Sequence, residues 1–213
     1  MHFLITAGGT REYIDPVRFI SNASSGKMGY ALAAAALEAG HKVTLISASD
    51  LQPPVGMDFV GVDSAAEMFA AVKKNFAKCD CLIMAAAVSD YTPTRPSKNK
   101  IRSAKGGLTI KLKPTADILK WASKHKNEAR GTGHGARIVV GFALEEKNLR
   151  ANAERKLKEK NLDMIIANTP VAIGCGKTDA QIKTPHTTWL KFSKTSKTTI
   201  AKKIIALVEK FKE

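Results

Sequence analysis

Hydrophobic residues occur along this chain in short continuous runs that alternate with longer segments of helical periodicity. The continuous runs, rich in Val, Ile and Leu, predict strands at residues 4–7, 42–47, 59–62, 81–86, 138–143 and 161–168. Helices are predicted at residues 30–37 with a first turn at 24–27, and at 64–76, 148–160 and 197–211. Alternation at residues 108–112 predicts an edge strand, and residues 180–192 a final strand or hairpin.

The repeated order of strand, helix and strand indicates an α/β fold. We expect a Rossmann-like, open and mainly parallel sheet with helices on both faces, because parallel strands need helical crossovers. Ligands of such sheets bind beyond the carboxyl ends of the strands. With 213 residues, of which 44% are hydrophobic, the chain can bury one core, so residues 1–213 are expected to form a single domain.

Net charge narrows the range of partners. A formal charge of +15 and a pI near 9.8 favour anionic partners. The lysines are spread along the whole chain and aromatic residues make up only 6%, so no basic stripe with stacking rings marks a nucleic-acid surface. Small anions such as polyphosphates fit this composition better.

Cysteine usage and hydropathy bear on location. Cys79, Cys81 and Cys175 are odd in number and have no framework spacing, which is typical of a reducing cytoplasm. The pair around Asp80 has no second ligand pair, so no zinc site is expected. No apolar run reaches the roughly 18 residues of a membrane span, and the start lacks the basic segment of a signal peptide. A soluble, cytoplasmic protein without a membrane partner is expected.

The start of the first helix is a candidate anion site. Ser24, Ser25, Gly26 and Lys27 form its predicted first turn, where unpaired N–H groups and the helix dipole favour phosphate. A serine-capped helix start with a tight turn explains the same residues without a ligand. The spacing matches neither the dinucleotide fingerprint nor the phosphate loop, so neither motif is assigned.

Residues 6–12, 15–22 and 24–29, which read TAGGTRE, DPVRFISN and SSGKMG, resemble the opening signature of bacterial phosphopantothenate cysteine ligase, also called phosphopantothenoylcysteine synthetase. Ala23 departs from this signature, where a bulkier residue is usual. The resemblance covers nearly the whole chain and is to a stand-alone form without the flavin decarboxylase domain. It implies that Asn22 is catalytic. The substrate contacts that it implies are Asn22, Ser25, Gly26 and Asn168.

The same resemblance implies a nucleotide site. Without it, the small residues before Asp90 are an ordinary strand end, and Lys156 and Lys160, which share one helix face, are typical of a solvated surface. With it, Phe142 lies against the base and the two lysines bind the triphosphate. The implied nucleotide-binding residues are Met84, Ala85, Ala86, Asp90, Lys100, Lys113, Pro114, Thr115, Ala116, Phe142, Lys156 and Lys160.

Two polar stretches are interpreted as loops. Residues 91–107 are basic, and on composition alone such a charge run is merely solvated. The resemblance implies that they form a flexible active-site loop in which Lys100 is catalytic and stabilises charge that develops in the transition state. Here Arg102 keeps the family's positive charge and Ser103 loses it. Residues 130–137 are rich in glycine, but they precede a strand and are interpreted as a linker.

The resemblance implies a ligase that joins 4'-phosphopantothenate to L-cysteine in coenzyme A biosynthesis. CTP would convert the carboxylate to an acyl-cytidylate with release of pyrophosphate, and cysteine would then release CMP. Mg²⁺ would accompany the triphosphate, held mainly by phosphate and water, so no protein metal site is expected. A homodimer is implied as well, formed through a smaller region of loops and strands.

Three alternatives remain on the residues alone. An ATP-dependent form of the ligase differs only in the base that it selects. A NAD(P)-dependent oxidoreductase of Rossmann type suits the α/β pattern, but the first turn lacks its fingerprint, and Ser47-Ala48-Ser49 stands where an acidic residue is expected. A nucleic-acid-binding module would use the charge but lacks the stacking residues.

Overall fold

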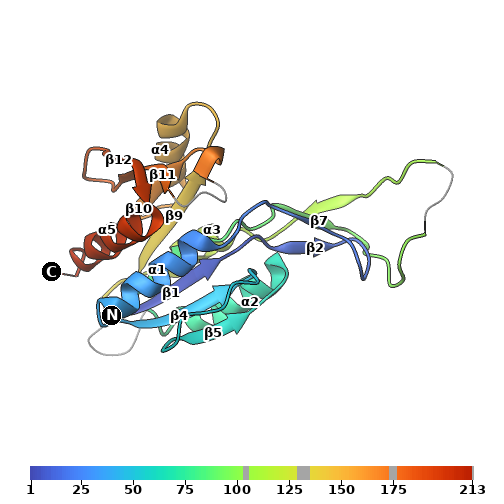
Figure 1. The fold of residues 1–213 in the computed structure, drawn as a ribbon, viewed down its shortest axis with the longest axis horizontal. Coiled ribbons are helices and arrows are strands. Elements are labelled where there is room, and N and C mark those ends of the chain that lie inside the picture. Colours follow the sequence, from blue (N-terminus) through green and yellow to red (C-terminus); the bar gives the residue numbers. More distant parts are fainter. Residues whose placement is uncertain (103–105, 129–134, 173–176, 213) are drawn as a thin grey trace.

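The computed structural model describes residues 1–102, 106–128, 135–172 and 177–212. In this part of the chain an open eight-stranded sheet has the order β12-β11-β10-β9-β6-β1-β4-β5 (Figure 1). Its six parallel strands are β10 (Met164–Asn168), β9 (Ile138–Leu144), β6 (Cys81–Met84), β1 (His2–Ala7), β4 (Lys42–Ser47) and β5 (Asp58–Gly61). The antiparallel hairpin of β11 (Lys177–Lys183) and β12 (Leu190–Ser196) completes the other edge.

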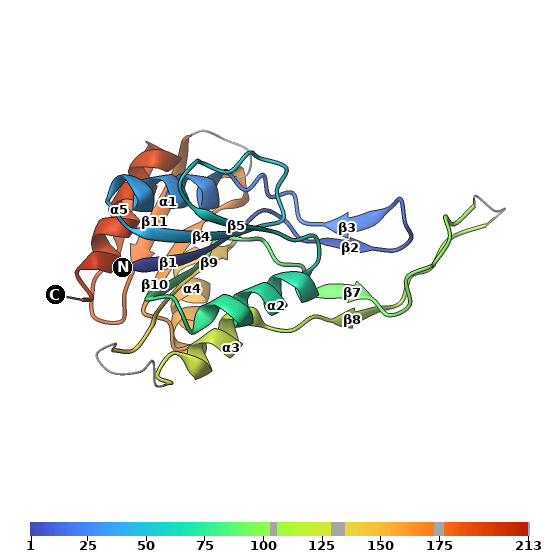
Figure 2. The same ribbon diagram turned by 90° about the horizontal axis from the view of Figure 1, so that it is seen from below.

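Helices cover both faces of this sheet. Figure 2 shows α1 (Lys27–Glu38) and α5 (Lys197–Glu209) on one face, and α2 (Ala65–Phe76) and α3 (Ile118–His125) on the other, which α4 (Leu149–Glu159) also covers. Both faces of β1 are therefore buried: Phe3 and Ile5 pack with α1 and α5, and Leu4 with α2, α3 and α4. Each such side chain contributes about 1.5–3 kcal/mol. The predicted Rossmann-like α/β fold is confirmed.

The predicted strands of the sheet differ from the structure by a few residues at their ends. The predicted start of α1 differs both in position and in its cap. Helix α1 begins at Lys27, and its N-cap is Gly26 in the left-handed conformation, without a side-chain cap. Of the predicted first turn at residues 24–27, only Lys27 is therefore helical, and the alternative of a serine cap is wrong as well. In contrast, α2 has a side-chain cap, since the Ser64 hydroxyl accepts a hydrogen bond from the Glu67 N–H at 3.2 Å.

Two antiparallel ribbons project from the sheet on one side (Figure 1, Figure 2). The first ribbon is the hairpin of β2 (Arg11–Tyr13) and β3 (Phe19–Ser21), which the sequence did not predict. The second ribbon pairs β7 (Tyr91–Pro93) with β8 (Leu112–Pro114). The strand expected at residues 108–112 is wrong, since regular pairing begins only at Leu112.

Some predictions fall outside the described residues: Ser103 and Lys105 of the basic loop, most of the 130–137 linker, and Cys175. A short 3₁₀ turn, Pro170–Ala172, follows β10. Within the described residues, every helix is too short or too polar to cross a lipid bilayer.

Candidate functional site

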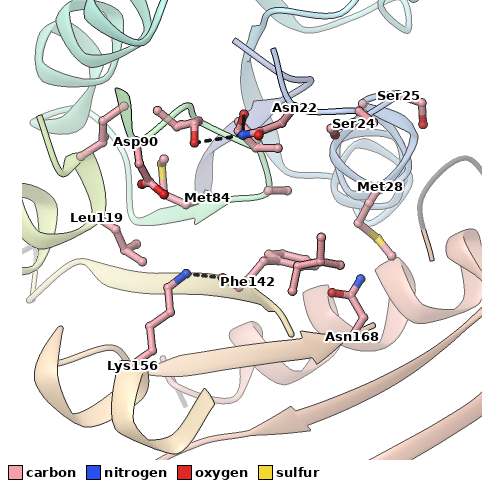
Figure 3. A pocket seen from close by; sticks show the side chains of 18 of the residues that line it. Asn22, Ser24, Ser25, Met28, Met84, Asp90, Leu119, Phe142, Lys156 and Asn168 are labelled. Atoms are coloured by element: carbon pink, nitrogen blue, oxygen red, sulfur yellow. Dashed lines mark hydrogen bonds between the residues drawn. The ribbon is translucent and has the colours of Figure 1, made fainter. Parts of the chain in front are cut away.

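A cavity of about 610 Å³ opens at the carboxyl edge of the parallel strands (Figure 3). Its walls are residues 22–28, 84–88 and 115–119, together with the ends of β9 and β10. Neighbouring residues of a strand point to opposite faces of a sheet, and the cavity is lined from both. Phe142 packs with the α1 and α5 layer, and Met84 with the layer of α2, α3 and α4. The cavity therefore wraps around the rim of the sheet.

The first turn of α1 forms the wall on one face. Gly26 has a φ of 78°, and a Cβ at this position would lie 2.7 Å from the Cβ of Ser49. The Ser49 hydroxyl donates to the carbonyl oxygen of Ser25 at 3.1 Å. These contacts fix the loop before α1 against the end of β4. The first N–H groups of α1, which have no acceptor inside the helix, thus lie at the cavity wall and favour an anion.

Asn22 stands where the first ribbon returns to the sheet. Its side-chain Nδ2 donates to the carbonyl oxygens of Ala87 and Val88, at 3.1 Å and 3.3 Å. A ligand that accepts from this amide therefore competes with these two carbonyls. The bonds also tie the segment before α1 to the segment after β6.

A hydrogen-bonded network supports the opposite wall. The buried Thr10 hydroxyl oxygen accepts from the Ser89 N–H at 2.9 Å. The Thr115 hydroxyl donates to the Ser89 carbonyl at 2.6 Å, and the Thr115 N–H to the Asp90 carbonyl at 2.9 Å. Thr115, predicted as a nucleotide contact, therefore also holds the residues after β6 in place.

Two lysines of α4 reach the cavity with different partners. The Lys156 ammonium donates to the carbonyl oxygen of Phe142 at 2.7 Å (Figure 3). The C-cap Lys160 forms an ion pair with Asp117 at 2.8 Å. Asp117 also caps α3, since its Oδ1 accepts from the Lys120 N–H at 2.9 Å. The predicted common face of Lys156 and Lys160 is confirmed.

The charges of these groups are coupled. Burial lowers the pKa of the Lys156 ammonium, and the nearby charge of Lys160 lowers it further, against the opposing effect of Asp117. Burial by itself raises the pKa of Asp117, but the hydrogen bonds from Lys160 and from the Lys120 N–H outweigh it, so the pKa is lowered overall. Asp117 thus stays ionised at neutral pH.

Most of the predicted site residues line this one cavity. They are Asn22, Ser25, Gly26, Met84, Ala85, Ala86, Asp90, Thr115, Ala116, Phe142, Lys156, Lys160 and Asn168. The Phe142 ring packs with the α1 and α5 layer, and the backbone carbonyl of this residue accepts from Lys156.

Three predicted nucleotide-binding residues, Lys100, Lys113 and Pro114, do not line the cavity. Lys113 and Pro114 are exposed residues of β8, and Lys100 is exposed in the segment after β7. Lys113 and Pro114 belong to the ribbon of β7 and β8, which projects from the sheet (Figure 2), and Lys100 lies in the segment between these two strands.

Several lining residues were missed. Asp117 directly follows the predicted Ala116, and Glu145 lies two residues after the predicted strand at 138–143, so position alone could have indicated both. The Glu145 carboxylate accepts from the Asn152 side chain at 2.9 Å, which holds it at the end of β9. Lys197 starts the last helix, and no local pattern connects it with the cavity.

Comparison with known proteins assigns the chain to a family. The profile described as "DNA/pantothenate metabolism flavoprotein C-terminal domain" matches residues 1–211. The chain belongs to this family. The resemblance to phosphopantothenate cysteine ligase that was inferred from the opening signature is thereby confirmed.

A sequence relative and a solved structure support this family assignment. The chain is 46% identical over 177 residues to the coenzyme A biosynthesis bifunctional protein CoaBC of Bacillus subtilis (strain 168), which covers 82% of this chain and 42% of that protein. The solved C-terminal domain of a CoaBC has 35% identity and a TM-score of 0.82, and covers 99% of this chain and 94% of that one. The chain therefore spans less than half of the bifunctional relative.

A second similar structure is a Cab2 variant in complex with phosphopantothenate-cysteine. It has 20% identity and a TM-score of 0.79, and covers 99% of this chain and 87% of that one. At this identity the likeness shows the fold alone.

Proposed function

We propose that this chain is a phosphopantothenate cysteine ligase of coenzyme A biosynthesis, which joins 4'-phosphopantothenate to L-cysteine at the expense of CTP. The observation that carries the proposal is the cavity around the sheet rim, with a helix N-terminus on one face and a lysine pair on the other. The first face suits a phosphate monoester and the second a triphosphate. Two ligands bound in this way meet at the strand ends between them.

The reaction needs an activated carboxylate, because oxide is too poor a leaving group for direct attack by an amine. In the proposed first step a carboxylate oxygen of phosphopantothenate attacks the α-phosphorus of CTP, and pyrophosphate leaves. In the second step the cysteine amine attacks the acyl carbon of this acyl-cytidylate and loses a proton. CMP leaves and keeps the oxygen that came from the carboxylate.

The lysine pair is proposed to bind the β- and γ-phosphates. Charge-assisted hydrogen bonds to phosphate are stronger than those to a neutral carbonyl, so Lys156 would exchange the Phe142 carbonyl for a phosphate oxygen. Lys160 would likewise bind a phosphate oxygen, either together with Asp117 or in its place. Both ammonium groups then stabilise the charge that grows on the departing pyrophosphate.

Asn22 is proposed to act in the second step. It lies between the α1 face and the segment after β6, at the place where the acyl group and the nucleotide would join. When one of its bonds to Ala87 or Val88 opens, its amide can donate to the acyl-cytidylate. Ser25 and Gly26 would meet the phosphate of phosphopantothenate, and Asn168 its pantothenate chain.

Lys100 is proposed to act in the active site of the other chain of a homodimer. It is exposed and does not line the cavity of its own chain. The projecting ribbons carry exposed apolar side chains, with Val17 at 58%, Phe19 at 46% and Tyr91 at 55%, which favours burial against a second copy. Such a dimer could bring the segment that carries Lys100 to the partner's nucleotide.

Mg²⁺ is proposed to arrive with the triphosphate. The ion would be held mainly by phosphate and water. Asp90, which lines the cavity, is the carboxylate proposed to assist. When bound, the ion would neutralise part of the phosphate charge. The proposed location is the cytoplasm, and the proposed partners are small molecules rather than nucleic acid.

Mass spectrometry of the reaction products tests this function. Purified chain with phosphopantothenate, cysteine, Mg²⁺ and CTP should yield phosphopantothenoylcysteine and CMP in equal amounts. Parallel reactions with ATP decide the base, and reduction of NAD(P) under any condition would favour the oxidoreductase instead. Absence of the ligated product with all four nucleoside triphosphates would contradict the proposal.

A further inference from the structure

A buried carboxylate lies outside the cavity, at the turn of the first ribbon. The Asp15 side chain is 0% exposed, although its neighbours Pro16 and Val17 are exposed. Removing a carboxylate from water is unfavourable unless donors and a positive charge replace the lost solvent. The partners of the Asp15 carboxylate therefore show which groups compensate for its burial.

Local donors account for most of these partners. The N–H groups of Val17 and Arg18 both donate to Oδ1 at 2.8 Å. The Arg18 guanidinium meets Oδ2 through Nε at 3.0 Å and Nη2 at 2.7 Å. Burial by itself raises the pKa of Asp15, but these donors, with the Ile101 N–H, hold the pKa at about 2.

One partner is remote in sequence. The N–H of Ile101, which is 86 positions away, donates to Oδ2 of Asp15 at 3.1 Å. The Arg18 Nη2 donates to the carbonyl oxygen of the same Ile101. The Asp15–Arg18 pair therefore holds both backbone polar groups of one residue in the segment between β7 and β8, and that residue directly follows Lys100.

The other end of this segment is also held. The Ser97 N–H donates to the Ile14 carbonyl at 2.9 Å. Within the segment, the Ser97 hydroxyl donates to the Asn99 carbonyl at 2.6 Å, which closes a turn. Residues 97–101 thus rest on the first ribbon at both ends, with the exposed Lys100 between.

We propose that Asp15 and Arg18 are positioning residues for Lys100, which they act on by clamping the peptide that follows it. The inference rests on the proposed role of Lys100 in the ligase. If the loop that carries Lys100 were unrestrained, its backbone would lose conformational entropy each time the lysine bound the triphosphate. The clamp removes that loss in advance, as preorganised catalytic groups require.

Amide hydrogen exchange and steady-state kinetics of the intact chain test the clamp together. Asp15→Asn keeps the side-chain shape but removes the charge and places an amide where N–H donors converge. We expect exchange at Ile101 to quicken at least tenfold, and kcat to fall at least tenfold while the KM for CTP changes less than threefold. Lys100→Ala should lower kcat alike and leave the Ile101 exchange unchanged.

Two further variants keep the test decisive. Asp58→Asn removes an exposed carboxylate of β5 that pairs with Lys42 at 3.4 Å, and it should change neither readout. Should Asp15→Asn fold poorly, Arg18→Lys retains a charge beside Asp15 but loses the guanidinium fork that reaches Ile101. It should give a smaller change in both readouts.

The outcomes separate the clamp from the ligase. Fast exchange with an unchanged kcat in Asp15→Asn would overturn the positioning role and leave a merely structural contact. Unchanged exchange would overturn the clamp itself. An undiminished kcat in Lys100→Ala would overturn the inference while the ligase stands. If the wild-type chain forms no product, the proposed function fails and the positioning role fails with it.

Discussion

Asp117 and Lys160 form an ion pair inside the cavity, with 2.8 Å between the carboxylate Oδ2 and the ammonium Nζ. The pair joins the start of α3 to the end of α4. Its side chains are 41% and 27% exposed, so solvent screens it, and such pairs contribute about 0–1 kcal/mol. A multiply charged phosphate can therefore displace the carboxylate. The pair orients Lys160 without locking it.

The first prediction concerns this lysine. Lys160→Ala should raise the KM for CTP about 10- to 100-fold, because a charge-assisted hydrogen bond to phosphate contributes about 1.5–3 kcal/mol. The matched control is Lys158→Ala on the same helix, which removes the same charge away from the cavity. Equal effects of the two substitutions, measured by initial rates against CTP concentration, would show only loss of overall charge.

The second prediction separates the two chemical steps. Asn22→Asp keeps the size of the side chain but replaces its donor by a carboxylate that repels the neighbouring Ala87 and Val88 carbonyls. Pyrophosphate should still appear in a burst, and an acyl-cytidylate should accumulate without ligated product. Quenched samples analysed by mass spectrometry check this. Normal product formation would remove Asn22 from the catalytic residues.

The third prediction is a pH dependence. Burial holds the pKa of Lys156 below its ordinary value of 10.5. Only the ammonium form binds phosphate well, so CTP affinity should be full below the lowered pKa and decline as pH rises through it. Lys156→Arg should remove this decline, since a guanidinium stays charged. Calorimetry gives the Kd for CTP of both proteins from pH 7 to 10. If the affinity of both falls in parallel as pH rises, Lys156 is not the cause of the pH dependence.

The fourth prediction concerns the seat of α1. A Cβ on Gly29 would lie 2.5 Å from the Ala7 Cβ and 2.9 Å from the Thr6 carbonyl oxygen. Gly29→Ala should therefore destabilise the fold by about 1–3 kcal/mol, and thermal unfolding measures it. Gly135→Ala, where a Cβ meets nothing within 4 Å, is the control. An unchanged Tm for Gly29→Ala would mean that α1 shifts freely on the sheet.

The fifth prediction tests the shared site. If Lys100 acts on the partner's nucleotide, Lys100→Ala and Asn22→Asp each impair both sites of their own dimer. Mixing the two variants and allowing subunits to exchange should then restore up to about half of the wild-type activity per mixed dimer, because one of its two sites regains both residues. No recovery, with exchange shown by mass spectrometry, would place Lys100 and Asn22 in the same chain's site.

Much of the sheet could be predicted because its strands are buried on both faces and are therefore apolar throughout, as residues 138–143 illustrate. The same holds for α4, whose buried Ala153 and Leu157 repeat at helical spacing. The first ribbon could not be predicted. Its strands have three residues each, and a remote contact, the hydrogen bond from the Ala65 N–H to the Glu12 carboxylate at 2.9 Å, fixes it to α2.

The candidate site shows the same division. Lys156 and Lys160 could be paired from their spacing, because helix geometry is local. Lys100 could not be placed, since its position depends on Asp15, 86 residues before the following Ile101. Asp117 adjoins the predicted Ala116 in sequence, but its ion pair with Lys160 could not be predicted, because the two residues belong to different helices.

The central claim is that the carboxylate of phosphopantothenate is activated by transfer of a nucleotidyl group. The most direct test is to label both carboxylate oxygens with ¹⁸O and to follow the label into the products by mass spectrometry. We predict one ¹⁸O in the phosphate of CMP, one in the amide of the product, and none in pyrophosphate. Unlabelled CMP, or label in inorganic phosphate, would contradict the account.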